Sequence, residues 1–113
     1  METLGPQAFD DLLDEVLHDR SSLRPRFVWA LALCSERHER LLPLLREWLP
    51  SSSGNLRMQI ATSIAHVLTE RRMKGQLVDD ADVALFKAVL IPEATPGTRL
   101  TLREFDRASA GAG

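Results

Sequence analysis

The sequence has little or nothing of several features that mark common classes of protein. Its 113 residues include one cysteine, Cys34, so no internal disulfide can form, and we expect a reducing, cytoplasmic location. No apolar run approaches the ~18 residues that a membrane-spanning helix needs. The first residues have neither the basic segment nor the apolar segment of a secretory signal. Tyrosine is absent, and no stretch alternates polar and apolar residues as a strand would. These absences favour a soluble, all-α chain.

The composition is that of a globular protein, with 44% hydrophobic and 27% charged residues, which excludes disorder of the whole chain. A chain of this length suits one domain. Near its end, Thr101-Leu-Arg-Glu104 has the pattern of a capping box, which predicts a short last helix. We therefore expect a single helical domain over 1–108, followed by a disordered tail at 109–113.

Helical periodicity covers most of the first half of the chain. After an amphipathic first helix, a second is expected through 27–34, with Ser21 or Ser22 as its N-cap. A third is expected over about 36–49 and contains Pro43. Because proline removes a helical hydrogen bond, this third helix should kink or begin late.

Glycine, aspartate and proline mark the expected ends of the helices in the second half of the chain. The longest helix is expected over 56–73, ended by Gly75 in the usual position after a helix. Asp79 or Asp80 should cap a fifth helix, which must stop before Pro92 because the residue before a proline disfavours helical backbone.

Charge is distributed unevenly along the chain. Residues 1–19 hold six acids and no base, whereas residues 20–78 hold ten bases and four acids. One interpretation is that the two segments screen each other within a small domain. The other is a basic surface that contacts phosphates, for which the candidates are Arg57, Arg71, Arg72 and Lys74. A sequence pI of about 5.9 is low for a dedicated nucleic-acid-binding protein.

The first half of the chain contains an internal repeat. A shift of 32 positions pairs apolar residues of the first helix with apolar residues of the third: Phe9, Leu12, Leu13, Val16 and Leu17 with Leu41, Leu44, Leu45, Trp48 and Leu49. A shift of 33 pairs residues of the second helix with identical or similarly apolar residues of the fourth: Leu23, Arg24, Phe27, Leu31, Ala32 and Cys34 with Leu56, Arg57, Ile60, Ile64, Ala65 and Val67. Two helical hairpins in tandem are the simplest explanation.

Residues 41–68 resemble a HEAT repeat. The resemblance rests on a first helix with an internal proline, Pro43, a short polar turn, and the pair Leu56-Arg57 opening a second helix. It implies a short right-handed stack of antiparallel helical hairpins, closed by a degenerate terminal pair, with hairpins at about 6–35, 36–74 and 79–108. Proteins of this family mostly bind other proteins through the surface lined by the second helices.

A candidate docking face follows from the helical projection. On the fourth helix the stripe opposite the apolar one is Gln59, Thr62, Ser63, His66 and Thr69, and the repeat places Trp29 and Leu33 at matching positions of the second helix. An aromatic residue beside an arginine is typical of an interface hot spot. We assign partner binding to Arg26, Trp29, Leu33, Thr62 and His66, with Trp29 as the anchor. The alternative is that the acidic first helix or the N-terminal segment covers Trp29 and makes it core.

The residues that catalysis or metal binding needs do not form a recognisable pattern. The histidines His18, His38 and His66 are far apart, with no second ligand expected at the third or fourth position after any of them, so we expect no metal, no cofactor and no enzyme activity. Asp79, Asp80 and Asp82 are better explained as acids that cap a helix and interact with its dipole than as cation ligands.

Three functions are consistent with these features. The leading one is a non-catalytic protein-binding module, such as an adaptor, an inhibitor or a small assembly subunit. The alternative is a small helical subunit of a nucleoprotein complex that contacts phosphates through its basic middle segment. A third is an obligate homo-oligomer, since about three repeats are usually needed for a stable stack.

Overall fold

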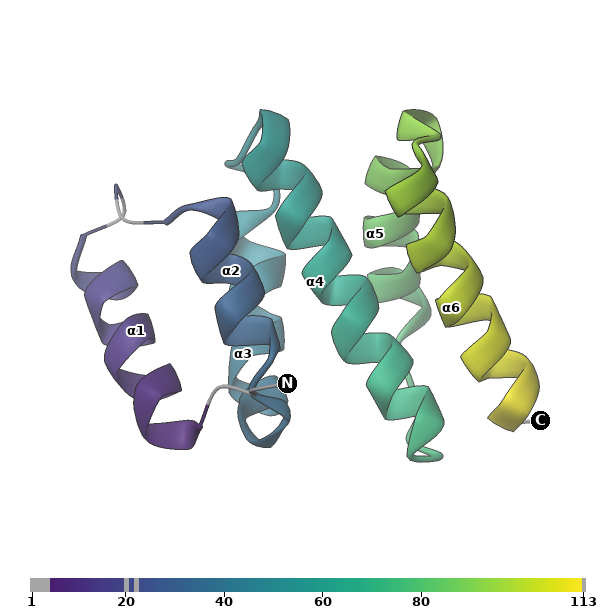
Figure 1. The fold of residues 1–113 in the computed structure, drawn as a ribbon, viewed down its shortest axis with the longest axis horizontal. Coiled ribbons are helices and arrows are strands. Elements are labelled where there is room, and N and C mark those ends of the chain that lie inside the picture. Colours follow the sequence, from purple (N-terminus) through teal and green to yellow (C-terminus); the bar gives the residue numbers. More distant parts are fainter. Residues whose placement is uncertain (1–4, 20, 22, 113) are drawn as a thin grey trace.

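Six α-helices form the computed structural model, which describes residues 5–19, 21 and 23–112, the last four of these by backbone alone (Figure 1). The prediction of an all-α chain is confirmed over these residues, which contain no strand. None of the described helices is both long and apolar enough to cross a membrane. The helices are α1 (Pro6–His18), α2 (Pro25–Ala32), α3 (His38–Trp48), α4 (Gly54–Met73), α5 (Asp80–Glu93) and α6 (Pro96–Ala112).

Helix α4 is the centre of the arrangement. It packs against α2 and α6 on its two sides and also against α3 and α5, while α1 packs on the outer side of α2. Figure 1 shows α2, α4 and α6 next to one another, with α3 and α5 behind them. Every other helix except α1 therefore depends on contact with α4.

Most of the circumference of α4 is buried. Seven of its side chains have an exposed fraction of zero: Ile60, Ala61, Ser63, Ile64, Ala65, Val67 and Leu68. Successive residues on a helix are rotated by about 100°, so the burial of these seven side chains leaves only a narrow strip of α4 facing outward. That strip is where any functional side chain of α4 must lie.

The two repeats predicted from the sequence have closely similar burial. Of the five pairs related by a shift of 32, four have the same burial class in α1 and α3, and only Leu17, 47% exposed, differs from its counterpart Leu49, which is 4% exposed. Leu17 lies on α1, the first of the described helices, whose main contacts are with α2 and the 3-10 turn at Ser35–Arg37.

The start of α2 differs from expectation, whereas the late start of α3 agrees with it, and each of the two helices contains a proline. Arg24, not Ser21, is the N-cap of α2, and Ser22 lies outside the described residues. Pro25 occupies the first helical position, and it holds the preceding residue in an extended conformation, so the helix cannot start earlier. Helix α3 begins at His38 after a single 3-10 turn, which is the late start expected from Pro43.

The two ends of the loop between α4 and α5 are as predicted. Gly75 has a φ of 74°, its N–H donates to the carbonyl of Arg72, and the N–H of Gln76 donates to the carbonyl of Arg71. These two bonds are those of a Schellman motif, which needs a left-handed residue after the helix. At the other end the Asp79 carboxylate accepts the N–H of Ala81 at 2.9 Å and caps α5.

The predicted loop between α5 and the last helix is much shorter than expected. Helix α5 continues through Pro92 to Glu93, so the expectation that it stops before the proline was wrong. Helix α6 begins at Pro96 rather than at the predicted capping box, because Thr95 and Thr98 cap it reciprocally: each backbone N–H donates to the hydroxyl of the other, at 3.0 and 3.3 Å. It extends to Ala112, where we had expected a disordered tail from 109.

The acidic first helix and the basic middle of the chain interact directly. Asp10 accepts hydrogen bonds from Arg37 Nε at 3.2 Å and from Arg40 Nη1 at 3.1 Å. The hydrogen bond from Arg37 is the main cause that lowers the pKa of Asp10 below its ordinary value. At these residues the structure supports screening of opposite charges within the domain, the first of the two interpretations of the charge pattern.

A second ion pair joins α3 to α5. Both guanidinium nitrogens of Arg46 that face Asp82 donate to its carboxylate at 2.6 Å. The Asp82 side chain is 3% exposed and that of Arg46 is 40% exposed. A buried carboxylate without its partner is strongly unfavourable, so this bidentate pair fixes α5 relative to α3.

Removing the guanidinium of Arg46 should therefore lower the free energy of unfolding much more than removing a guanidinium at the surface. We expect Arg46→Met to lower the free energy of unfolding by about 2–3 kcal/mol, because Asp82 is left buried and unpaired. Arg40→Met, which breaks a half-exposed pair with Asp10, should lower the free energy of unfolding far less. Urea unfolding at neutral pH measures both values. Equal losses for the two variants would contradict this role of Asp82.

The Asp10 pair makes stability depend on pH on the acid side. Because the pKa of Asp10 is lower in the folded state, its contribution is complete above the unfolded-state pKa and is lost as pH falls through the folded-state pKa. We expect Arg37→Gln to raise the pKa of Asp10 toward its ordinary value, as measured by a carboxyl-carbon NMR titration. Arg24→Gln, a change to an exposed arginine outside this pair, should leave it unchanged, and an unaltered Asp10 titration in Arg37→Gln would refute the assignment.

Candidate functional site

The predicted docking face lies along α2 and α4. Arg26 is exposed on α2, Leu33 is half-buried at its end, and Thr62 is half-buried on α4. Trp29 is 36% exposed, and its ring meets that of His66 edge-on, with 5.2 Å between centroids and an angle of 61°. The structure thus brings Trp29 and His66 together, and Trp29 is partly open to solvent rather than core.

The stripe expected on α4 is half-buried where we expected it to face solvent. Its threonines use their hydroxyls within the helix: Thr62 donates to the carbonyl of Met58 at 2.9 Å, and Thr69 donates to that of Ala65 at 2.7 Å. Ser63 is fully buried, and among the described residues its hydroxyl has no hydrogen-bond partner. Its assignment to a solvent-facing stripe was wrong, since Ser63 lies at the edge of the buried side of α4.

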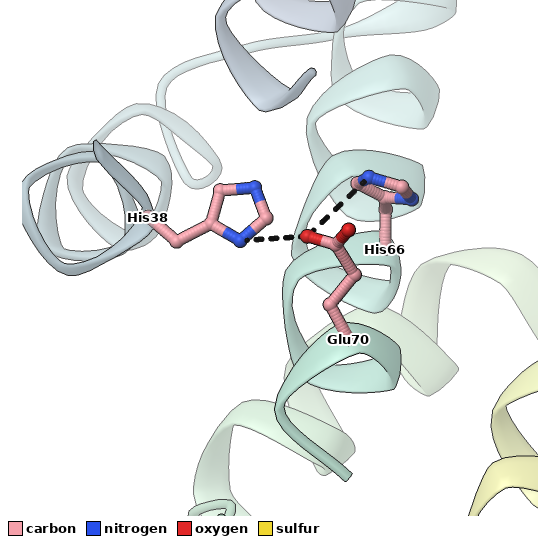
Figure 2. A group of neighbouring side chains, drawn as sticks. All are labelled: His38, His66 and Glu70. Carbon is pink, nitrogen blue, oxygen red and sulfur yellow. Dashed lines mark ion pairs between the residues drawn. The ribbon is translucent and has the colours of Figure 1, made fainter. Parts of the chain in front are cut away.

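A cluster of three titratable side chains lies directly beneath Trp29. His38, the first residue of α3, points toward Glu70 of α4, and His66 lies one turn before Glu70 on the same helix (Figure 2). The Glu70 Oε2 atom is 3.1 Å from His38 Nδ1 and 4.0 Å from His66 Nε2. The two imidazole rings meet edge-on at 5.8 Å between centroids.

The orientation of His38 is fixed by a backbone carbonyl. Its Nε2 atom lies 2.7 Å from the carbonyl oxygen of Ala32, the last residue of α2, and its side chain is 7% exposed. A carbonyl oxygen can only accept, so Nε2 carries the hydrogen. In the neutral ring this leaves the lone pair of Nδ1 facing the carboxylate of Glu70. A cation between these two atoms would therefore be favourable, because both would present lone pairs to it.

Glu70 and His66 are held in different environments. The hydroxyl of Ser35 contacts both carboxylate oxygens of Glu70, at 3.1 and 3.0 Å, and orients the group. Burial is the main cause that lowers the pKa of His66, while the charge of Glu70 acts in the opposite direction. The lowered pKa of His66 favours its neutral imidazole at neutral pH, and one ring nitrogen then has a lone pair that can bind a metal ion.

A hollow of about 160 Å³ opens beside this cluster. It is lined by residues from the 3-10 turn, from α3 and from the end of α4: Ser35, Glu36, His38, Glu39, Glu70, Arg71, Lys74 and Gln76. Two further carboxylates and two bases on its wall balance each other in formal charge. His38 and Glu70 of the cluster line this hollow, so small solutes can approach these two residues from that side.

The four candidate phosphate ligands do not form one patch. Arg57 lies near the start of α4 and Arg71, Arg72 and Lys74 at its end, about 20 Å apart along the axis at 1.5 Å per residue. Arg72 is further engaged with Phe105 of α6, its guanidinium carbon 4.0 Å from the ring centroid. Arg71 and Lys74 share the hollow described above. A single phosphate-binding surface made of all four residues is not what the geometry favours.

No known relative was found. No family model matches the chain, and no curated protein or solved structure matches it. The site is therefore interpreted from its own geometry.

The cluster was not predicted from the sequence, for two reasons. The statement that no second ligand stands four residues after a histidine was wrong, because Glu70 stands four residues after His66. His38 joins them only through the packing of α3 against α4, which sequence spacing does not reveal. The pattern His-x-x-x-Glu within one helix was the available indication.

Proposed function

We propose that this chain is a non-catalytic protein-binding module, which docks a segment of a partner protein on the face formed by α2 and α4. The observation that carries the proposal is Trp29, whose large apolar ring stays 36% exposed although α1 and α4 both pack against its helix. Aromatic residues that are ordered by a neighbour and partly open to solvent are the usual anchors of interfaces.

The surroundings of Trp29 suit such an anchor. His66 braces one side of the ring, so little conformational entropy is lost when a partner covers it. Arg26 is exposed one turn earlier on α2 and can pair with an acidic group of the partner. Thr62 and Leu33, both half-buried, would form the edge of the contact.

We also propose that the helices are stacked as HEAT-like hairpins. The matched burial of α1 and α3 and the central place of α4 between α2 and α6 support this arrangement. In such a stack the second helices share one surface, and the docking face is that surface. A helical subunit that contacts phosphates remains the alternative, and the experiment below distinguishes the two.

The change that tests docking most directly is Trp29→Ala. It should weaken partner binding by ~2 kcal/mol, about 30-fold, because it removes the anchor. The wild type, Trp29→Ala and Ile91→Ala are used as three parallel baits in nuclease-treated lysate. The affinity of any protein that the wild type retains is then measured for all three. Ile91, 58% exposed on α5 and outside the face, is the matched control and should bind as the wild type does.

Two results would count against the proposal. If Trp29→Ala and Ile91→Ala bind the partner equally well, the face is misplaced. If binding disappears with nuclease and weakens linearly with the logarithm of salt concentration, the nucleoprotein alternative is correct.

A further inference from the structure

We propose that His38, His66 and Glu70 form a binding site for a transition-metal dication, with Zn²⁺ as the best match. Each residue offers one ligand atom, and these three atoms all lie within 4.8 Å of one another; the atoms that face Glu70 are His38 Nδ1 and His66 Nε2 (Figure 2). The proposal concerns the interior side of His66 and does not depend on whether a partner docks on Trp29.

The spacing of the three atoms is close to that of a tetrahedral site. Zinc bonds of 2.0–2.1 Å to nitrogen and oxygen place neighbouring ligands about 3.3 Å apart. The separations from Glu70 Oε2 are 3.1 Å to His38 and 4.0 Å to His66. Glu70 and His66 can both adjust, since they are only half-buried and stand on one face of α4.

The outer contacts are those that metal ligands usually have. A histidine ligand almost always donates its other N–H to a carboxylate or a backbone carbonyl, which fixes the tautomer and aims the lone pair at the metal. His38 does so through Nε2 and the carbonyl of Ala32 at 2.7 Å. The Glu70 carboxylate is likewise held by a hydroxyl, that of Ser35. These two contacts orient His38 and Glu70 and do more than fill the space between α2, α3 and α4.

The donor set selects the class of metal. Two imidazoles and one carboxylate suit Zn²⁺ and neighbouring late transition metals, whereas Mg²⁺ and Ca²⁺ prefer oxygen ligands alone. Three protein ligands leave one tetrahedral position, which would be filled by water or a donor atom from the adjoining hollow. A dication would also supply the positive charge that is favourable between His38 Nδ1 and Glu70.

The test uses the full chain after treatment with a chelator. Co²⁺ is titrated first, because its visible absorption reports tetrahedral coordination, and Zn²⁺ is then added to displace it. We expect one Co²⁺ per chain, loss of the absorption on addition of Zn²⁺, and a higher melting temperature with Zn²⁺ present. His38 is buried, so the variants are His66→Ala and Glu70→Gln, whose side chains are less critical for folding.

Each of these variants should weaken metal binding by at least ~10-fold, the smallest loss usual even for outer-shell changes. His18→Ala is the matched control, because it removes an exposed histidine of α1 outside the cluster, and it should bind as the wild type does. Absence of saturable one-to-one binding would overturn the proposal. Equal weakening by His18→Ala and His66→Ala would overturn it as well.

Discussion

Burial of α4 on most of its circumference is the constraint on which the rest of the structure depends. Small and aliphatic side chains let α2, α3, α5 and α6 all approach this one helix, and Ser63 is buried with them. Among the described ion pairs between helices other than α4, that of Arg46 and Asp82 has the most buried carboxylate, and it joins α3 and α5, which lie behind α4. The domain is thus organised around a single central helix rather than around several equal contacts.

This constraint leaves α4 one narrow, half-buried strip, and the functional proposals both arise there. His66 lies on the strip with one face against Trp29 and another toward His38 and Glu70. A residue shared in this way couples the surface of α2 to the cluster beneath it. Occupation of the cluster would hold His66 still and so stiffen the anchor that a partner meets, without any larger rearrangement of the helices.

Sequence patterns predicted the helices as far as the start of α5, whereas the end of α5 and the start of α6 were predicted wrongly, and partner binding at Trp29 stays a prediction. Periodicity, Gly75 and Asp79 predicted the course of the chain through α4 and into α5, because these features act locally. Residues 101–104 match the capping-box pattern in the sequence, but Thr95 and Thr98 cap α6 instead. Trp29 and His66 followed from the repeat. The cluster did not, because His38 and Glu70 belong to different helices and meet only through tertiary packing.

The most direct test of this account observes both tryptophans at once. Trp29 touches His66, whereas Trp48 is 1% exposed and lies about 15 Å along α3 from His38 at 1.5 Å per residue. In a ¹⁵N NMR spectrum the two indole N–H groups give separate peaks. If the cluster binds Zn²⁺ and His66 couples it to the docking face, adding the metal shifts the Trp29 peak and leaves the Trp48 peak in place. Peaks that both stay fixed, or both move equally, would contradict the account.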